Sequence, residues 1–188
     1  YYTPRLSFDE FLNLSPNIIT TSACLASPLN KLEEDNPYYE KLIQKYDYLE
    51  VQPHNCDEQE VFNQRLFELS KKYSKPLIAG TDTHNISQYK AECRAILLAR
   101  KHKTYGDEDH YDLTWKTYDE LVEMFKNQGV LTEESYLQAI ENTNALADSI
   151  EDFSLDTAIK YPVLHGSYEE DVRVFKALTE EMFSEKIA

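Results

Sequence analysis

The first hundred residues alternate between short β-prone runs and helical stretches, and this alternation limits the folds that the chain can adopt. In 47-DYLEVQPH-54, Leu49 and Val51 alternate with polar residues, which is the period of a strand. Repeated strand–helix units favour parallel strands joined by crossover helices. We therefore expect an α/β fold with strands at 17–21, 47–54 and 76–80, and helices at 37–45, 57–73 and 87–101.

The helix expected at 57–73 has the clearest internal pattern. Phe62, Leu66 and Leu69 recur at helical spacing, so one face should pack inward. Asp57 is followed three residues later by Glu60, which is the pattern of a capping box. The sequence therefore predicts a helix that is capped by Asp57 and that buries its apolar face.

Beyond residue 102 the alternation stops and helical patterns dominate. Thr117 with Glu120, and Thr132 with Ser135, are spaced as helix N-caps. The polar run before them has no periodicity. We expect a loop at 103–115 and helices at 117–127 and 132–149.

The last part of the chain has little to pack against. Residues 151–167 fit an extended linker, and 168–186 has the pattern of an amphipathic helix. This helix looks like the start of another domain. The chain also opens on two tyrosines without an initiator Met, so we expect a piece of a longer protein.

Side chains that bind metals or transfer protons stand where the predicted strands end. Cys24 follows the first strand, His54 the second, and Asp82 with His84 the third. Functional sites gather at the carboxyl ends of parallel strands. Carboxylate, imidazole and thiolate are all ligands for Zn²⁺ and similar ions. The pattern therefore favours a metal site at this edge, with 76-PLIAGTDTHN-85 as its strongest part.

A plain structural reading of the same residues stays open. Asp82 can cap the turn after its strand, with His84 a satisfied and partly buried imidazole. His54 follows a proline and also fits an exposed turn. Cys56 and Cys93 have no partner pattern and fit inert thiols.

Composition limits the partners. The chain has 34 acidic and 19 basic residues and a net charge of −15, which makes it too acidic to bind DNA strongly. Three widely spaced cysteines without a CxxC motif fit a reducing cytoplasm. No apolar run is long enough to span a bilayer. The P-loop, GxGxxG and GxSxG motifs are absent, which argues against those nucleotide sites and a hydrolase nucleophile elbow.

Several stretches resemble one protein family. The segment YLEVQPHNCDEQEVFNQRLFELSKKYSKPLIAGTDTHN is similar to the last part of the PHP (polymerase and histidinol phosphatase) domain in the bacterial replicative DNA polymerase III alpha family, the C-family polymerases. YYTPRLSFDEFL and IITTSACLASPL are similar to that family's Tyr-Tyr-x-Pro-Arg segment and Ser-Gly-Cys-Leu turn. Further matches are 116-KTYDELVEMF-125 and 139-AIENTNALAD-148. The resemblance covers nearly the whole chain.

The resemblance implies part of a distorted PHP-type βα barrel followed by a helical extension. Residues 1–102 would be the C-terminal half of the PHP domain and 103–150 the helical extension. Residues 151–188 would be the linker and first helix toward the palm domain.

The resemblance also implies a metal cluster of Zn²⁺ or Mn²⁺. Its metal ligands here would be Cys24, Asp82 and His84, with His54 and Glu50 lining the site. The remaining ligands would lie on strands that this chain does not contain, so the site would be incomplete. Thr81 stands where the family often has Asn, which removes no ligand.

For function, the resemblance implies a DNA-directed DNA polymerase whose Mg²⁺-binding palm carboxylates are absent here. DNA and dNTPs would bind the rest of the polymerase, with a proofreading subunit and a sliding clamp as partners. The PHP region would add a 3′–5′ exonuclease activity or act as a scaffold, and this piece alone is expected to be inactive. Two alternatives are a free-standing PHP metal-dependent phosphoesterase and a non-catalytic module that docks a partner. The stretches after residue 115 argue against the phosphoesterase.

Overall fold

The computed structural model describes residues 5–103, 111–158 and 162–187. Two compact units divide the chain, Tyr1–Ile150 and Glu151–Ala188. The predicted loop at 103–115 falls partly outside the described residues. No described helix is long and apolar enough to cross a membrane.

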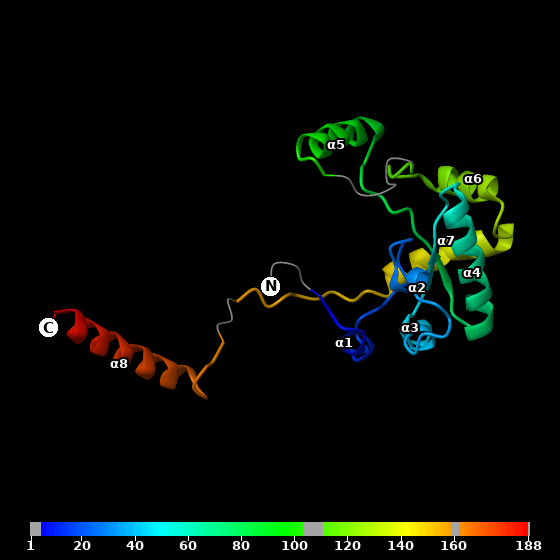
Figure 1. Ribbon diagram of the computed structural model, residues 1–188. Coiled ribbons are helices and arrows are strands. Elements are labelled where there is room, and N and C mark those ends of the chain that lie inside the picture. Colours follow the sequence, from blue (N-terminus) through cyan, green and yellow to red (C-terminus); the bar gives the residue numbers. More distant parts are fainter. Residues whose placement is uncertain (1–4, 104–110, 159–161, 188) are drawn as a thin grey trace. The chain divides into compact units, whose positions relative to one another are not determined.

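Two short parallel strands form the sheet of the first unit (Figure 1). β1 (Leu49–Val51) pairs with β2 (Leu77–Ala79), with Leu49 opposite Leu77 and Val51 opposite Ala79. This pairing confirms parallel strands in an α/β arrangement, within narrower bounds than predicted.

The strand predicted at 17–21 was wrong, because the backbone pairing there is too short for a strand: the Ser22 amide donates to the Tyr48 carbonyl and the Tyr48 amide to the Thr20 carbonyl, both at 3.2 Å. Only Thr21 makes a bridge, parallel to Tyr48. The Thr20 amide donates to the Asp47 carboxylate at 2.7 Å rather than to a neighbouring carbonyl. Two positions after Thr20, the Ser22 hydroxyl accepts from the Glu50 amide at 2.8 Å.

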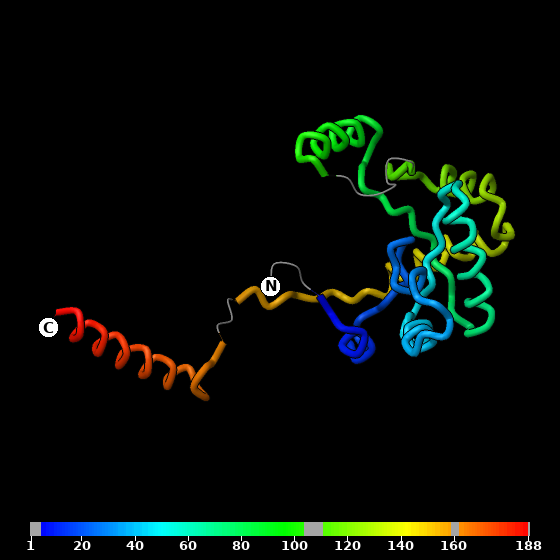
Figure 2. Tube along the Cα trace, viewed as in Figure 1, coloured from blue at the N-terminus to red at the C-terminus, as the bar shows by residue number. Residues whose placement is uncertain are grey.

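The longer helices confirm their predicted positions. They are α3 (Tyr39–Lys45), α4 (Asp57–Tyr73), α5 (Gln88–Arg100), α6 (Tyr118–Gln128), α7 (Glu133–Asp148) and α8 (Tyr168–Ile187). Two short helices, α1 (Phe8–Leu12) and α2 (Pro28–Lys31), had no sequence prediction. Figure 2 follows the chain through these elements.

Helix caps were predicted correctly at two of three positions. The Thr117 hydroxyl accepts from the Glu120 amide and forms a full capping box, and Thr132 accepts from the Ser135 amide. The cap at Asp57 was wrong. Cys56 is the N-cap residue and makes no side-chain cap, so Asp57 lies in the first turn, where its charge favours the helix dipole.

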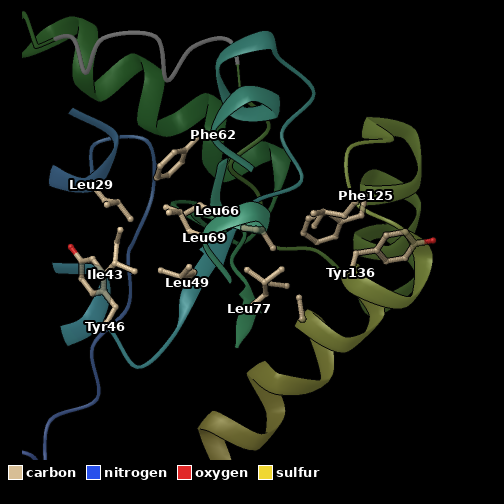
Figure 3. Close-up of a cluster of buried hydrophobic side chains, with 14 of the residues drawn as sticks. Leu29, Ile43, Tyr46, Leu49, Phe62, Leu66, Leu69, Leu77, Phe125 and Tyr136 are labelled. Carbon is tan, nitrogen blue, oxygen red and sulfur yellow. The ribbon is translucent and has the colours of Figure 1, made fainter. Parts of the chain in front are cut away.

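One apolar core joins helices α2, α3, α4, α6 and α7 to both strands (Figure 3). The predicted face of α4 is buried there through Phe62, Leu66 and Leu69. Leu49 and Leu77 enter the same core from the strands. Burying one such side chain stabilises the fold by roughly 1.5–3 kcal/mol.

Helix α7 covers the outer edge of β2. The Ala79 amide donates to the Thr143 hydroxyl at 3.1 Å, and this hydroxyl lies 3.2 Å from the Ala79 carbonyl oxygen. The Asn142 amide group donates to the Leu77 carbonyl at 2.7 Å. Side chains of α7 therefore satisfy backbone groups that an open edge would expose to other strands.

Candidate functional site at the strand ends

Asp82 and His84 come together just after β2. His84 Nε2 lies 3.5 Å from Asp82 Oδ1, and each side chain is about one-third exposed. Asp82 has a φ of 47°, in the left-handed region that few non-glycine residues adopt. The backbone beyond is fixed, because the amides of His84 and Asn85 both donate to the Leu113 carbonyl. The predicted pair is therefore held on a defined turn.

His54 lies beyond the end of β1 and is buried, with 5% of its surface exposed. Its Nε2 atom has no hydrogen-bond partner among the described residues, and its ring centroid lies 5.2 Å from that of Tyr111. Burial lowers the pKa of His54 below its ordinary value, which the charge of Asp82 opposes. Burial thus favours the neutral form of His54, and the prediction of an exposed turn was wrong.

Asp112 and Lys116 add charges near His54 that sequence reasoning did not find. Lys116 Nζ lies 2.9 Å from Asp112 Oδ2, with the lysine side chain 8% exposed. Burial alone would raise the pKa of Asp112, but hydrogen bonds from Thr114 and Lys116 outweigh it and hold the pKa below its ordinary value. The sequence does not link these residues to His54, because they lie more than fifty positions away in the chain.

Glu50 reaches the turn after Thr21 and the end of β2. Its carboxylate accepts from Gln52 Nε2 at 2.8 Å and from the Thr21 hydroxyl at 3.3 Å. A Cβ atom at Gly80 would lie 2.2 Å from Glu50 Oε1. A larger residue at position 80 would therefore force the Glu50 side chain to move, which places Glu50 at the predicted edge.

Cys24 is half-buried on a turn in which the preceding Ala23 has a φ of 57°. It does not join Asp82 and His84, since no three His, Cys, Asp or Glu side chains among the described residues are grouped to hold a metal ion. The described donors thus do not fit a complete metal site. The assignment of these three ligands stays a prediction.

Buried amide side chains fix the backbone that leads to His54. Asn63 Nδ2 donates to the Gln52 carbonyl at 2.7 Å, and the Gln52 amide donates back to Asn63 Oδ1 at 3.2 Å. Gln128 Nε2 donates to the carbonyls of Gln52 and His54, at 3.0 and 2.7 Å. Helices α4 and α6 therefore hold the end of β1 in place.

Comparison with known proteins gives related polymerases, although no family model matches. A DNA polymerase III subunit alpha of Borreliella burgdorferi is 26% identical over 174 residues, covering 82% of this chain and 14% of that protein. The Aquifex aeolicus DNA polymerase III subunit alpha is 27% identical, covering 87% of this chain and 16% of that protein. A PolC-type DNA polymerase III of Clostridium perfringens is 29% identical, covering 90% of this chain and 13% of that protein.

The chain spans 13–16% of the length of these three relatives. The similarity nevertheless covers most of this chain and includes both alpha and PolC-type subunits. The chain is therefore homologous to one segment of the bacterial DNA polymerase III alpha and PolC-type subunits.

Proposed function

We propose that the chain works in DNA replication as one segment of a DNA-directed DNA polymerase. The observation that carries this proposal is similarity to DNA polymerase III subunits over more than four-fifths of the chain. Within such a polymerase, DNA and dNTPs would bind mainly through other segments, in the cytoplasm. A proofreading subunit and a sliding clamp would be the partners of the whole enzyme.

The segment itself is proposed to be the end of a PHP-type barrel followed by a helical extension. The parallel strand pair supports this, together with Asp82 and His84 on the turn beyond β2. Because the similarity extends through the helical extension as well, a free-standing phosphoesterase is the weaker alternative.

Asp82 and His84 are proposed as this chain's share of a Zn²⁺ or Mn²⁺ site whose other ligands lie elsewhere in the polymerase. Such a metal, when bound, would activate water for hydrolysis of phosphate esters. The residues of this chain would only help to hold the metal. Asp82 and His84 lie on a fixed turn, and Glu50 adds a carboxylate at the same end of the strands. No catalytic step follows from the described donors alone.

A scaffold role is the second candidate, and the buried amide cluster favours it. Asn63, Gln52 and Gln128 join the end of β1 to helices α4 and α6 without any exposed reactive group. Such a rigid joint would brace the parts of a polymerase whether or not a metal binds nearby.

The test compares metal content in the polymerase that contains this segment with metal content in the chain alone, by mass spectrometry. Bound Zn²⁺ or Mn²⁺ that is lost in Asp82→Asn, with loss of 3′–5′ exonuclease activity and retention of primer extension, would support the metal site. Glu58→Gln, an exposed acid in the first turn of α4, is the matched control. If neither the wild-type polymerase nor its Asp82→Asn variant contains metal, the metal site is refuted and the scaffold role remains.

A further inference from the structure

Helix α5 differs in charge from the rest of this acidic chain. Between residues 88 and 103 there are five basic side chains and one acidic side chain, whereas the whole chain carries −15. The exposed cations are Lys90, Arg100, Lys101 and Lys103. None of these four forms an ion pair with a described residue.

The cations lie on one surface of the helix together with exposed apolar side chains. Residues seven and eleven positions apart share a helical face, which gives two adjacent rows. The first row is Tyr89, Ile96 and Arg100, and the second is Lys90, Leu97 and Lys101. We call these six residues the α5 outer face.

The α5 outer face has no cover within the described part of the chain. Ile96 is 72% exposed and Tyr89 68% exposed, and no residue of α5 is buried. At the helix end, the Lys103 amide donates to the Leu98 carbonyl at 3.1 Å, which holds the backbone of this fourth cation at the last turn of α5.

We propose that the α5 outer face binds a single strand of nucleic acid. This inference rests on the proposed replication function, because a polymerase segment meets nucleic acid. The ammonium group of Lys90 lies 5.7 Å from the centre of the exposed Tyr89 ring. Cations beside an exposed aromatic ring are the recurring means of binding single strands, the ring stacking on a base while the cations neutralise phosphates.

The length of the surface fits this ligand. From Lys90 to Lys101 the helix rises about 17 Å, which matches about five nucleotides at roughly 3.4 Å each. An apolar protein surface would account for Ile96 and Leu97, but it leaves the four cations unexplained. The acidic remainder of the chain keeps the affinity low, although at physiological salt its charges are screened beyond about 8 Å.

The test measures binding of the whole chain to a fluorescent single-stranded oligonucleotide by anisotropy between 50 and 200 mM salt. Four phosphate contacts predict a slope of about −3 in log affinity against log salt, a loss of about 50-fold over this range. The variant K90Q/R100Q/K101Q should flatten the slope to about −1. The control K41Q/K71Q/K126Q makes the same change in net charge at exposed lysines elsewhere and should keep the wild-type slope.

Several outcomes would overturn the proposal. These are no binding at 50 mM salt, equal losses in both triple variants, or equal affinity for a duplex and a single strand. Self-association in sedimentation that disappears in the α5 variant would assign the surface to a protein partner instead. K90R/R100K/K101R keeps the charges and should bind normally, which separates lost contacts from a damaged helix. A negative result in this binding assay would refute the nucleic-acid surface on α5 but would not affect the metal-content test of the polymerase role.

Discussion

Helices α4 and α5 each follow one of the two strands, yet only α4 is buried. Both lie after a strand whose end carries candidate site residues. Leu66 of α4 is fully buried, whereas Leu97 of α5 is 49% exposed. The sequence thus locates both helices, but it does not tell whether the same chain supplies a partner for their apolar side chains.

The sharpest test of this contrast is the same substitution in both helices. Leu66→Ala should lower the free energy of unfolding by about 4 kcal/mol, because it empties a packed core position. Leu97→Ala should change it by less than about 0.5 kcal/mol, as for an exposed residue. Urea unfolding followed by circular dichroism measures both. A large loss from Leu97→Ala would show that α5 packs within this chain after all.

The next largest loss of unfolding free energy is expected in the buried amide cluster, which joins the buried helix α4 to the end of β1. Asn63→Ala removes hydrogen bonds to Gln52 and Gln128 and leaves buried polar groups unpaired. We expect a loss of about 3 kcal/mol, from about 1–3 kcal/mol for each unsatisfied group. Gln64→Ala, at the neighbouring exposed position, is the control in the same urea titration. Equal effects of the two substitutions would refute a structural role for the cluster.

Local patterns predicted much of the fold, because they act over a few residues. The hydroxyls of Thr117 and Thr132 cap their helices as the spacing of the sequence indicated. Helices α1 and α2, of five and four residues, are too short for periodicity to reveal. The strand at 17–21 shrinks to one bridge at Thr21. The Asp47 carboxylate and the Ser22 hydroxyl accept the amides of Thr20 and Glu50, which therefore do not extend the pairing.

The surroundings of the candidate site could not be predicted, because they depend on distant pairs. Asn63 and Gln128 are 65 positions apart, and nothing in the sequence indicates that their side chains meet. Asp112, in the loop predicted at 103–115, and Lys116, directly after that loop, act on His54 from distant positions in the chain. By contrast, Asp82 and His84 were found together, since two positions on one turn are a local feature.

The covered edge of β2 predicts a smaller effect. Thr143→Val keeps the side-chain shape but removes the hydroxyl from Ala79, so we expect a loss of about 1 kcal/mol. Thr179→Val in α8 is the matched control. The exposed Thr179 hydroxyl donates to a carbonyl of its own helix, as the Thr143 hydroxyl does to Ala139, but it has no bond to a strand within the described residues. Thermal unfolding compares the two. No difference would mean that the edge is held by packing rather than by this hydroxyl.

The smallest effect concerns His54 and the pH dependence of stability. Burial holds the pKa of His54 below its ordinary value, with Asp82 and Asp112 opposing the shift and Lys116 adding to it. The unfolded chain therefore takes up this proton near pH 6.5, while the folded chain takes it up only at lower pH. Stability should fall as the pH drops below about 6.5, because the unfolded state then binds more protons.

His54→Gln isolates this contribution from the many carboxylates that also titrate. The loss in unfolding free energy between pH 7.5 and pH 5.5 should be smaller in His54→Gln than in the wild type. His102→Gln, at an exposed position, should show the wild-type loss. If His54→Gln keeps the full pH dependence, His54 takes up its proton as readily in the folded as in the unfolded chain. The end of β1 would then be as open to water as helix α5. The region around β1 and α4 would no longer differ from α5 in burial at His54.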